Sequence, residues 1–160
     1  MKKTLSIISF TAIAAMALFF SGCDKQDEPV DTIVANYGIY CITGSYEDGT
    51  AYGRMYLYQN ASSYNAVTGG MSGEFIRFEF TLPKGAGSIF GQEMKIVKTP
   101  NKKGTSDCFC YKMHEVVKGW ISDGEIYIRT DAVSGRLKYE GKNYKFIFNG
   151  NIQQVEKANG

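Results

Sequence analysis

The sequence contains one histidine and one tryptophan, and it has no basic run interleaved with aromatic residues. Any catalytic scheme that depends on histidine must use His114, and no G-x-S-x-G nucleophile elbow is present. Nucleic-acid binding needs clustered lysine and arginine to displace counterions, so the sequence excludes this class. The sequence also lacks a helix with an apolar stripe, an internal repeat and a second domain. We therefore expect one non-enzymatic domain built from strands.

The first 22 residues have the pattern of an export signal. Lys2 and Lys3 precede an apolar run from Leu5 to Phe20, which is shorter than the ~20 apolar residues of a spanning helix. The segment Phe20-Ser21-Gly22-Cys23 resembles the lipobox of bacterial lipoproteins. This resemblance implies cleavage before Cys23 and acylation of both its thiol and the new amino terminus. The diacylglycerol and the N-terminal acyl group together supply three acyl chains, more than the two membrane-binding signals that stable anchoring requires.

An acidic segment follows the cysteine. Residues 24–31 carry four acidic residues against one lysine and show no apolar periodicity, which is typical of a solvated tether. The cluster resembles the surface-export signal of Bacteroidota lipoproteins, and this implies the outer leaflet of the outer membrane, facing outward. A polar linker that faces the periplasm is the alternative. We expect a signal peptide over 1–22, a lipidated cysteine and flexible tether over 23–34, a domain over 35–153 and a frayed tail over 154–160.

Composition then bounds the domain. Removal of residues 1–22 takes away two lysines and no acid, so 18 basic residues become 16 and balance 16 acidic ones. The remaining 138 residues (160 − 22) are enough for one domain with its own core. The 18 glycines, 11 tyrosines and 10 phenylalanines favour strands and turns over helices.

Alternation of apolar and polar residues is the dominant signal of the mature chain. It predicts about eight strands, and hence a single antiparallel β-sandwich or a lipocalin-like β-barrel with little or no helix. Loops are predicted over Asn60–Gly73 and Thr99–Asp107, and turns at Asp48-Gly49 and Asp123-Gly124. The predicted strands are Tyr37–Thr43, Ala51–Gln59, Glu74–Leu82, Glu93–Lys98, Cys108–Lys118, Glu125–Thr130, Arg136–Tyr139 and Tyr144–Phe148.

The pattern also resembles a loose group of small Bacteroidota surface lipoproteins with all-β domains. The segments that carry this resemblance are the Tyr37-Gly38 strand, the Glu74–Leu82 strand, and the late stretches ISDGEIYI and GKNYKFIFNG. The resemblance implies a location and a fold class only, because none of these segments is a binding or catalytic motif.

Three cysteines remain when Cys23 carries lipid, namely Cys41, Cys108 and Cys110. An odd number outside the cytoplasm leaves one free thiol or one intermolecular bond. We expect Cys41 to form a disulfide with either Cys108 or Cys110, which would stabilise the fold by about 3–5 kcal/mol. A Cys108–Cys110 bond is disfavoured, since alternate residues of a strand lie about 6.5–7 Å apart.

A metal site is the second interpretation of the cysteines. An unbroken strand over Cys108–Lys118 would place Cys108, Cys110, Lys112 and His114 on one face, and Cys41 could complete a zinc ligand set. Structural zinc sites normally use C-x₂₋₄-C spacing, which C-x-C on a strand does not supply. We therefore expect no metal and no cofactor apart from the lipid on Cys23.

Ligand binding is the remaining class of function. Tyrosine and arginine are enriched in binding hot spots and suit a sugar ring or a protein partner. An aromatic outer face can also be a second packed layer or a cross-strand ladder. Trp120 is expected in the core. The candidate binding residues, expected on one exposed face, are Tyr52, Arg54, Tyr56, Tyr58, Phe75 and Arg77.

These inferences combine into one expectation. The chain is expected to be an outer-membrane-anchored, surface-exposed lipoprotein that captures a glycan or peptide, or acts as an accessory of an outer-membrane transporter. A structural or adhesion module of the cell surface is one alternative. A lipocalin-like carrier of a small apolar ligand is the other.

Overall fold

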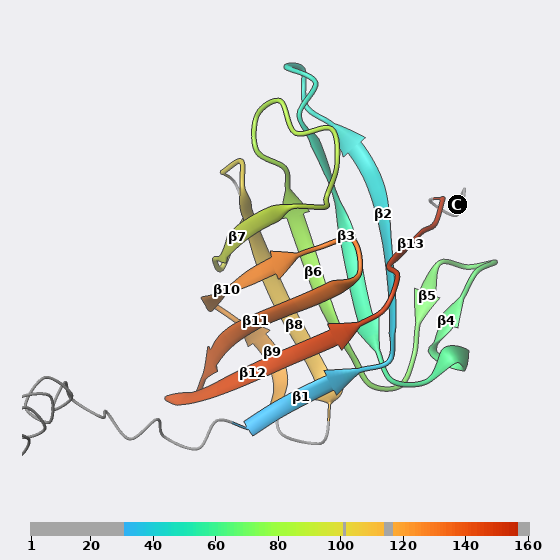
Figure 1. Cartoon of the computed structure of the whole chain (residues 1–160), viewed down its shortest axis with the longest axis vertical. Coiled ribbons are helices and arrows are strands. Elements are labelled where there is room, and N and C mark those ends of the chain that lie inside the picture. Colours follow the sequence, from blue (N-terminus) through green and yellow to red (C-terminus); the bar gives the residue numbers. More distant parts are fainter. Residues whose placement is uncertain (1–30, 101, 114–116, 157–160) are drawn as a thin grey trace, which may run out of the picture.

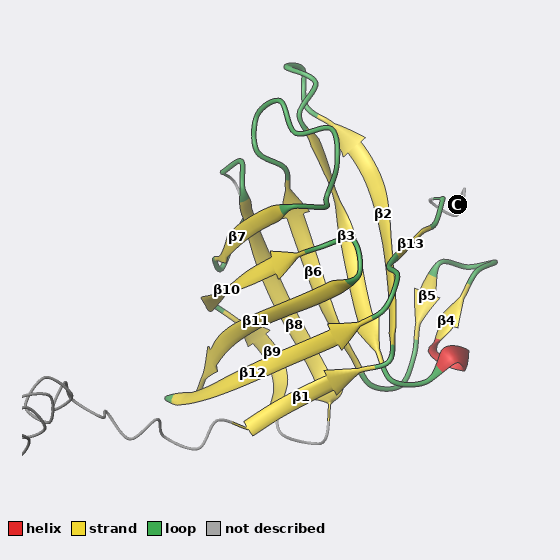
Figure 2. Cartoon of the chain, viewed as in Figure 1, coloured by secondary structure: helices red, strands yellow, loops and turns green. Residues whose placement is uncertain are grey.

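The computed structural model describes residues 31–100, 102–113 and 117–156 (Figure 1). The predicted signal peptide, Cys23 and His114 lie outside these ranges. The described part is all-β, which confirms the predicted fold class, and its one helical element is the short 3₁₀ turn η1 (Ala61–Ser63) (Figure 2). No helix in the described ranges is long and apolar enough to cross a membrane.

Eleven strands form one curled sheet, and two more form a separate hairpin. The order along the sheet is β1-β12-β11-β10-β7-β8-β6-β3-β2-β13, and β9 also pairs with β8. The strands are β1 (Asp31–Ala35), β2 (Tyr37–Ser45), β3 (Ala51–Tyr58), β4 (Tyr64–Asn65), β5 (Gly70–Met71), β6 (Phe75–Thr81), β7 (Gln92–Ile96), β8 (Thr105–Met113), β9 (Val117–Ile121), β10 (Asp123–Ile128), β11 (Ala132–Tyr139), β12 (Lys142–Asn149) and β13 (Gln153–Gln154).

The curled sheet has two layers, with β12, β11, β10 and β7 crossing over β2, β3, β6 and β8 (Figure 1). A parallel pair joins them, in which Lys95 and Ile96 of β7 lie opposite Thr105 and Ser106 of β8. At the other end the chain passes from β1 into β2 through Asn36, whose backbone N–H donates to the Tyr58 carbonyl oxygen at 3.0 Å. The result is a half-barrel, an intermediate between the two predicted architectures.

The core lies between the layers and is built by alternation. In β6, Ile76, Phe78 and Phe80 are buried, whereas the intervening side chains lie on the outer face. Phe78 contacts Phe146 of β12 with ring centroids 5.4 Å apart, so one aromatic pair bridges the layers. The interior is filled by large side chains, among them Met55, Leu57, Met94, Phe146 and Phe148.

Both predicted boundaries of the domain need correction. The expected tether over 23–34 includes residues that form β1, which pairs in parallel with β12 from Asp31 opposite Tyr144 to Ala35 opposite Phe148. The expected frayed tail begins at Gln154, but Gln154 lies in β13 and the Val155 N–H donates to the Tyr40 carbonyl at 2.8 Å. These short edge strands lack strong alternation, and pairing with distant strands places them, with Ile33 and Ala35 of β1 packed into the core. They account for two of the five strands beyond the predicted eight, and the other three are β4, β5 and β9.

The predicted turn at Asp123-Gly124 is also wrong. Both residues belong to β10, where Asp123 lies opposite Lys138 of β11. Gly124 has φ +145°, and a Cβ there would lie 2.3 Å from the Arg136 carbonyl oxygen. Glycine is therefore needed at this position because β11 approaches closely. The chain passes from one layer to the other at Ser122, between β9 and β10.

Candidate functional site

The outer face of the layer formed by β2, β3, β6, β8 and β9 is organised in rows of directly opposed residues. Register places Tyr56 of β3 opposite Ile39 on one side and Arg77 of β6 on the other. Arg77 lies opposite Phe109 of β8, which lies opposite Trp120 of β9. A row of side chains thus runs across all five strands, and we call these five residues the Trp120 row.

Aromatic contacts connect this row to the next one. Trp120 is 52% exposed and meets the Phe109 ring edge-to-face at 5.2 Å. The Arg77 guanidinium lies 5.1 Å from the Trp120 ring and 5.4 Å from the Phe109 ring, within cation–π range. Phe75 in the neighbouring row contacts Phe109, Tyr111 and Tyr56. The result is a continuous, partly exposed aromatic surface on an ordered sheet.

Charged groups lie along one side of this surface. Arg54 and Arg77 share the Glu79 carboxylate, with Nε to Oε1 distances of 3.2 and 3.6 Å. Asp107, opposite Glu79, is 5% exposed and accepts the Glu79 backbone N–H at 3.1 Å. Burial raises the pKa of Asp107 to about 6, and the Glu79 charge adds to this while the hydrogen bond and both arginines oppose it.

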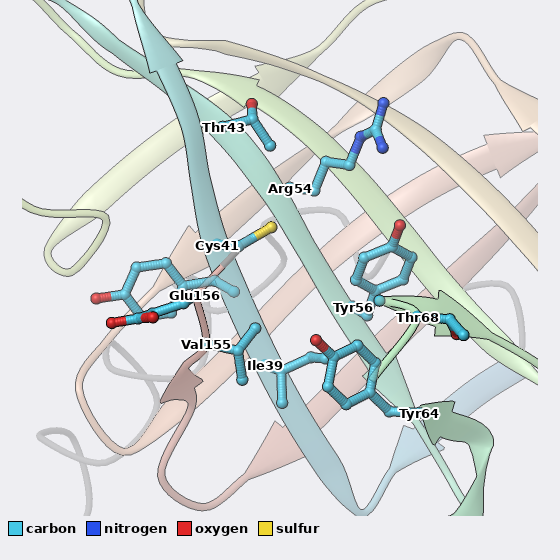
Figure 3. Close-up of a pocket in the computed structure, with 11 residues that line it drawn as sticks. Ile39, Cys41, Thr43, Arg54, Tyr56, Tyr64, Thr68, Val155 and Glu156 are labelled. Carbon is cyan, nitrogen blue, oxygen red and sulfur yellow. The ribbon is translucent and has the colours of Figure 1, made fainter. Parts of the chain in front are cut away.

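A pocket of about 170 Å³ opens on the same outer face, over β2 and β3. The β4–β5 hairpin folds over these strands and brings Tyr64 and Thr68 to the wall, and Val155 closes another side (Figure 3). Ile39 is 3% exposed, yet it lies on the outer face and outside the core cluster, because the pocket walls cover it. Burial, followed by the neighbouring Cys41 and Tyr56, raises the pKa of Tyr64, so its hydroxyl stays protonated at neutral pH.

The predicted binding residues divide into two groups. Arg54, Tyr56, Phe75 and Arg77 lie together on the outer face, as their alternation predicts. Tyr58 is buried, because the Tyr37 ring stacks on it at 5.5 Å.

Tyr52 lies apart from the others. Its ring covers Gly44, where a Cβ would lie 2.4 Å from the Tyr52 hydroxyl oxygen, and it contacts Tyr46 at 5.0 Å. Alternation correctly places Tyr52 and Tyr58 on the outer face, but both rings pack against neighbouring residues of the protein and are not grouped with the other candidate residues.

The largest correction concerns Trp120, which is expected in the core and is instead exposed at the end of its row. Val117 and Ile121 are the buried positions of β9. Alternation counted from those two positions would have placed Trp120 outward.

Sequence analysis also missed residues that other elements bring to the site. Pairing between β6 and β8 brings Phe109 and Tyr111 beside the predicted residues, and no feature of the neighbouring sequence predicts this pairing. Tyr64 and Thr68 come from a segment predicted as a loop.

The predicted disulfide is wrong, because Cys41, Cys108 and Cys110 are all free. Cys41 lies opposite Arg54 on the outer face, whereas Cys108 and Cys110 are buried on the inner face. Two strands, β3 and β6, separate β2 from β8, which places the strands about 14 Å apart.

The predicted metal face is broken by a bulge. Lys112 has φ +49° at a register shift between Tyr111 and Met113, so Met113 is buried and Lys112 exposed. Burial raises the pKa of Cys110 to about 12 and that of Cys108 well above its usual value, which disfavours the thiolate that binds metal. No group of three or more histidine, cysteine or acidic residues in the described ranges could hold a metal ion. The third predicted ligand, His114, lies outside the described residues.

This face therefore offers exposed rings, guanidinium and ammonium groups, and hydroxyls around a small pocket. Such groups bind by stacking, hydrogen bonding and charge. The chain matches no protein-family model, no curated protein and no solved structure.

Proposed function

We propose that this protein is a lipid-anchored lipoprotein of the outer membrane that faces outward and binds glycans without catalysing a reaction. The supporting observation is Trp120, which is half exposed and is held by Phe109 and Arg77 in a surface of further aromatic rings. An exposed aromatic ring lacks the favourable free energy of burying its apolar surface, and stacking on a ligand provides it. The C–H-rich face of a sugar ring suits such a platform, and its hydroxyls remain available to water and arginine.

The position of the platform on the outer face favours this function over the carrier alternative. A carrier of small apolar ligands needs interior space, whereas the core between the layers is filled by large side chains. An adhesion module that binds protein would also use tryptophan and arginine. The proposal is therefore tested with glycans and peptides in parallel.

Replacement of Trp120 by alanine is expected to weaken glycan binding at least about tenfold, the effect of a loss of ~1.4 kcal/mol. Truncation removes the exposed ring and leaves the buried positions of β9, Val117 and Ile121, in place. Binding is measured by calorimetry or a glycan array with protein lacking residues 1–30.

Tyr127→Ala is the matched control, because Tyr127 is 38% exposed and lies on β10 in the other layer. Equal loss in both variants would contradict the proposed site. Binding of peptides alone, dependent on Trp120, would favour the adhesion alternative over glycan capture.

The anchor is tested separately through Cys23→Ala. The variant is expected to move from the membrane fraction to the soluble fraction, since it loses the thiol that would carry diacylglycerol. Fractionation and metabolic labelling with palmitate provide the measurement, and accessibility of the wild type to added protease on intact cells reports its face. Retention of labelled Cys23→Ala protein in membranes would contradict the lipobox interpretation.

A further inference from the structure

We infer that the ligand is an acidic glycan chain that lies across the strands, with one ring in the Tyr64 pocket and another on Trp120. This inference rests on the proposed function and specifies its substrate class. It follows from three features of the outer face: the direction of the Trp120 row, the position and size of the pocket, and two lysines beside the far end of the row.

The row sets the direction and the length of the ligand. Ile39 and Tyr56, the first two residues of the row, also line the pocket, and Trp120 is its last residue. Four strand spacings of about 4.8 Å separate the two ends, so a ligand that reaches both spans about 19 Å. A monosaccharide would occupy one end only, and a chain of several rings is needed to contact both.

The pocket suits a single terminal ring. Its volume of about 170 Å³ is below the ~300–1,000 Å³ of sites for drug-sized ligands. Its apolar lining residues include Ile39 and Val155, and its polar lining residues include Tyr56, Tyr64 and Arg54. This combination of apolar and hydrogen-bonding side chains matches a sugar ring with an acidic substituent near Arg54. Glu156 lies on the opposite wall from Arg54 (Figure 3).

The charge at the other end favours an acidic chain. Lys112 and Lys118 lie 5.9 and 5.8 Å from the Tyr111 ring, beside Phe109 and Trp120. Within the described ranges, neither ammonium is in ion-pair distance of a carboxylate. Arg77 nearby shares the single Glu79 carboxylate with Arg54. Carboxylate or sulfate groups on the ligand would complement these cations.

The direction of the row also separates a glycan from an extended peptide. Peptides that bind to sheets commonly add a strand at an edge and form main-chain hydrogen bonds. The Trp120 row crosses the interior of the layer, where β3, β6 and β8 already have partners on both sides. Only side chains are available there, which favours a ligand recognised by rings and charges.

Calorimetry with oligogalacturonates of increasing length, and with their methyl esters, tests the inference. The ester has the same rings without the charge. We expect the acidic series to bind more tightly than the esters and to weaken with added salt. Affinity should rise with chain length and level off when both ends are contacted.

Two variants probe the two ends of the row. Lys118→Gln should weaken binding of the acidic series about fivefold and leave that of the esters unchanged, with Lys138→Gln on β11 as the matched control. Tyr64→Ala should weaken binding of long oligomers more than that of the disaccharide, which can also bind at Trp120 alone.

Each contrary result has a distinct meaning. Equal affinity for acids and esters, or no effect of length, would overturn this inference and leave glycan binding at Trp120 intact. Absence of binding to every oligosaccharide, combined with Trp120-dependent peptide binding, would overturn the proposed function as well.

Discussion

Phe78→Ala is expected to lower the free energy of unfolding by about 3–5 kcal/mol, the usual cost of truncating a buried phenylalanine. Phe78 is 1% exposed, and its contact with Phe146 joins the two layers. The substitution would leave a cavity between the two layers. Side-chain packing holds the layers together at this point, so backbone hydrogen bonds cannot compensate for the lost contact. Chemical denaturation of protein lacking residues 1–30 measures the change.

Val67→Ala is the control for this substitution. Val67 is 88% exposed and should change stability by less than about 0.5 kcal/mol. A loss for Phe78→Ala as small as that for the control would mean that the layers do not meet around this ring.

The second large effect is a pH dependence at Asp107. Its pKa is raised from 3.8 to about 6 in the folded protein, so folding favours the protonated carboxyl. The stability that this proton contributes is fully present below pH 4 and is lost as the pH rises through 6. The shift corresponds to up to about 3 kcal/mol.

Asp107→Asn isolates this contribution. The amide keeps the Oδ1 acceptor for the Glu79 N–H and cannot ionise. Unfolding of both proteins between pH 4 and pH 8 should show a gain in relative stability of the variant as the pH rises, complete above pH 7. A constant difference across this range would show that the Asp107 carboxyl titrates alike in the folded and unfolded protein.

Predictions from the sequence succeed where alternation is strong. The strand predicted over Glu74–Leu82 is β6, Phe75–Thr81, and its alternating apolar residues Ile76, Phe78 and Phe80 are buried. The same holds for Ala51–Gln59, where Met55 and Leu57 are buried and Arg54 is exposed. Successive side chains of a half-buried strand point to opposite faces, so a short segment of sequence is enough to predict which residues are buried.

Predictions fail where the partner of a residue is distant in the chain. Tyr58 follows the alternation of β3, and the ring that buries it belongs to Tyr37. The disulfide hypothesis assumed that Cys41 and Cys108 could meet, but pairing of β2 with β3 places them on opposite faces. Neither outcome can be read from a window of ten residues.

The sequence by itself determined the all-β class, the face of most side chains and the residues Arg54, Tyr56, Phe75 and Arg77 of the candidate surface. Only the tertiary structure decided that Phe109 and Trp120 extend this surface and that Tyr64 closes a pocket at its end. The reason is that side-chain alternation depends on neighbours in the chain, whereas register between β6, β8 and β9 depends on how the whole sheet curls around its core.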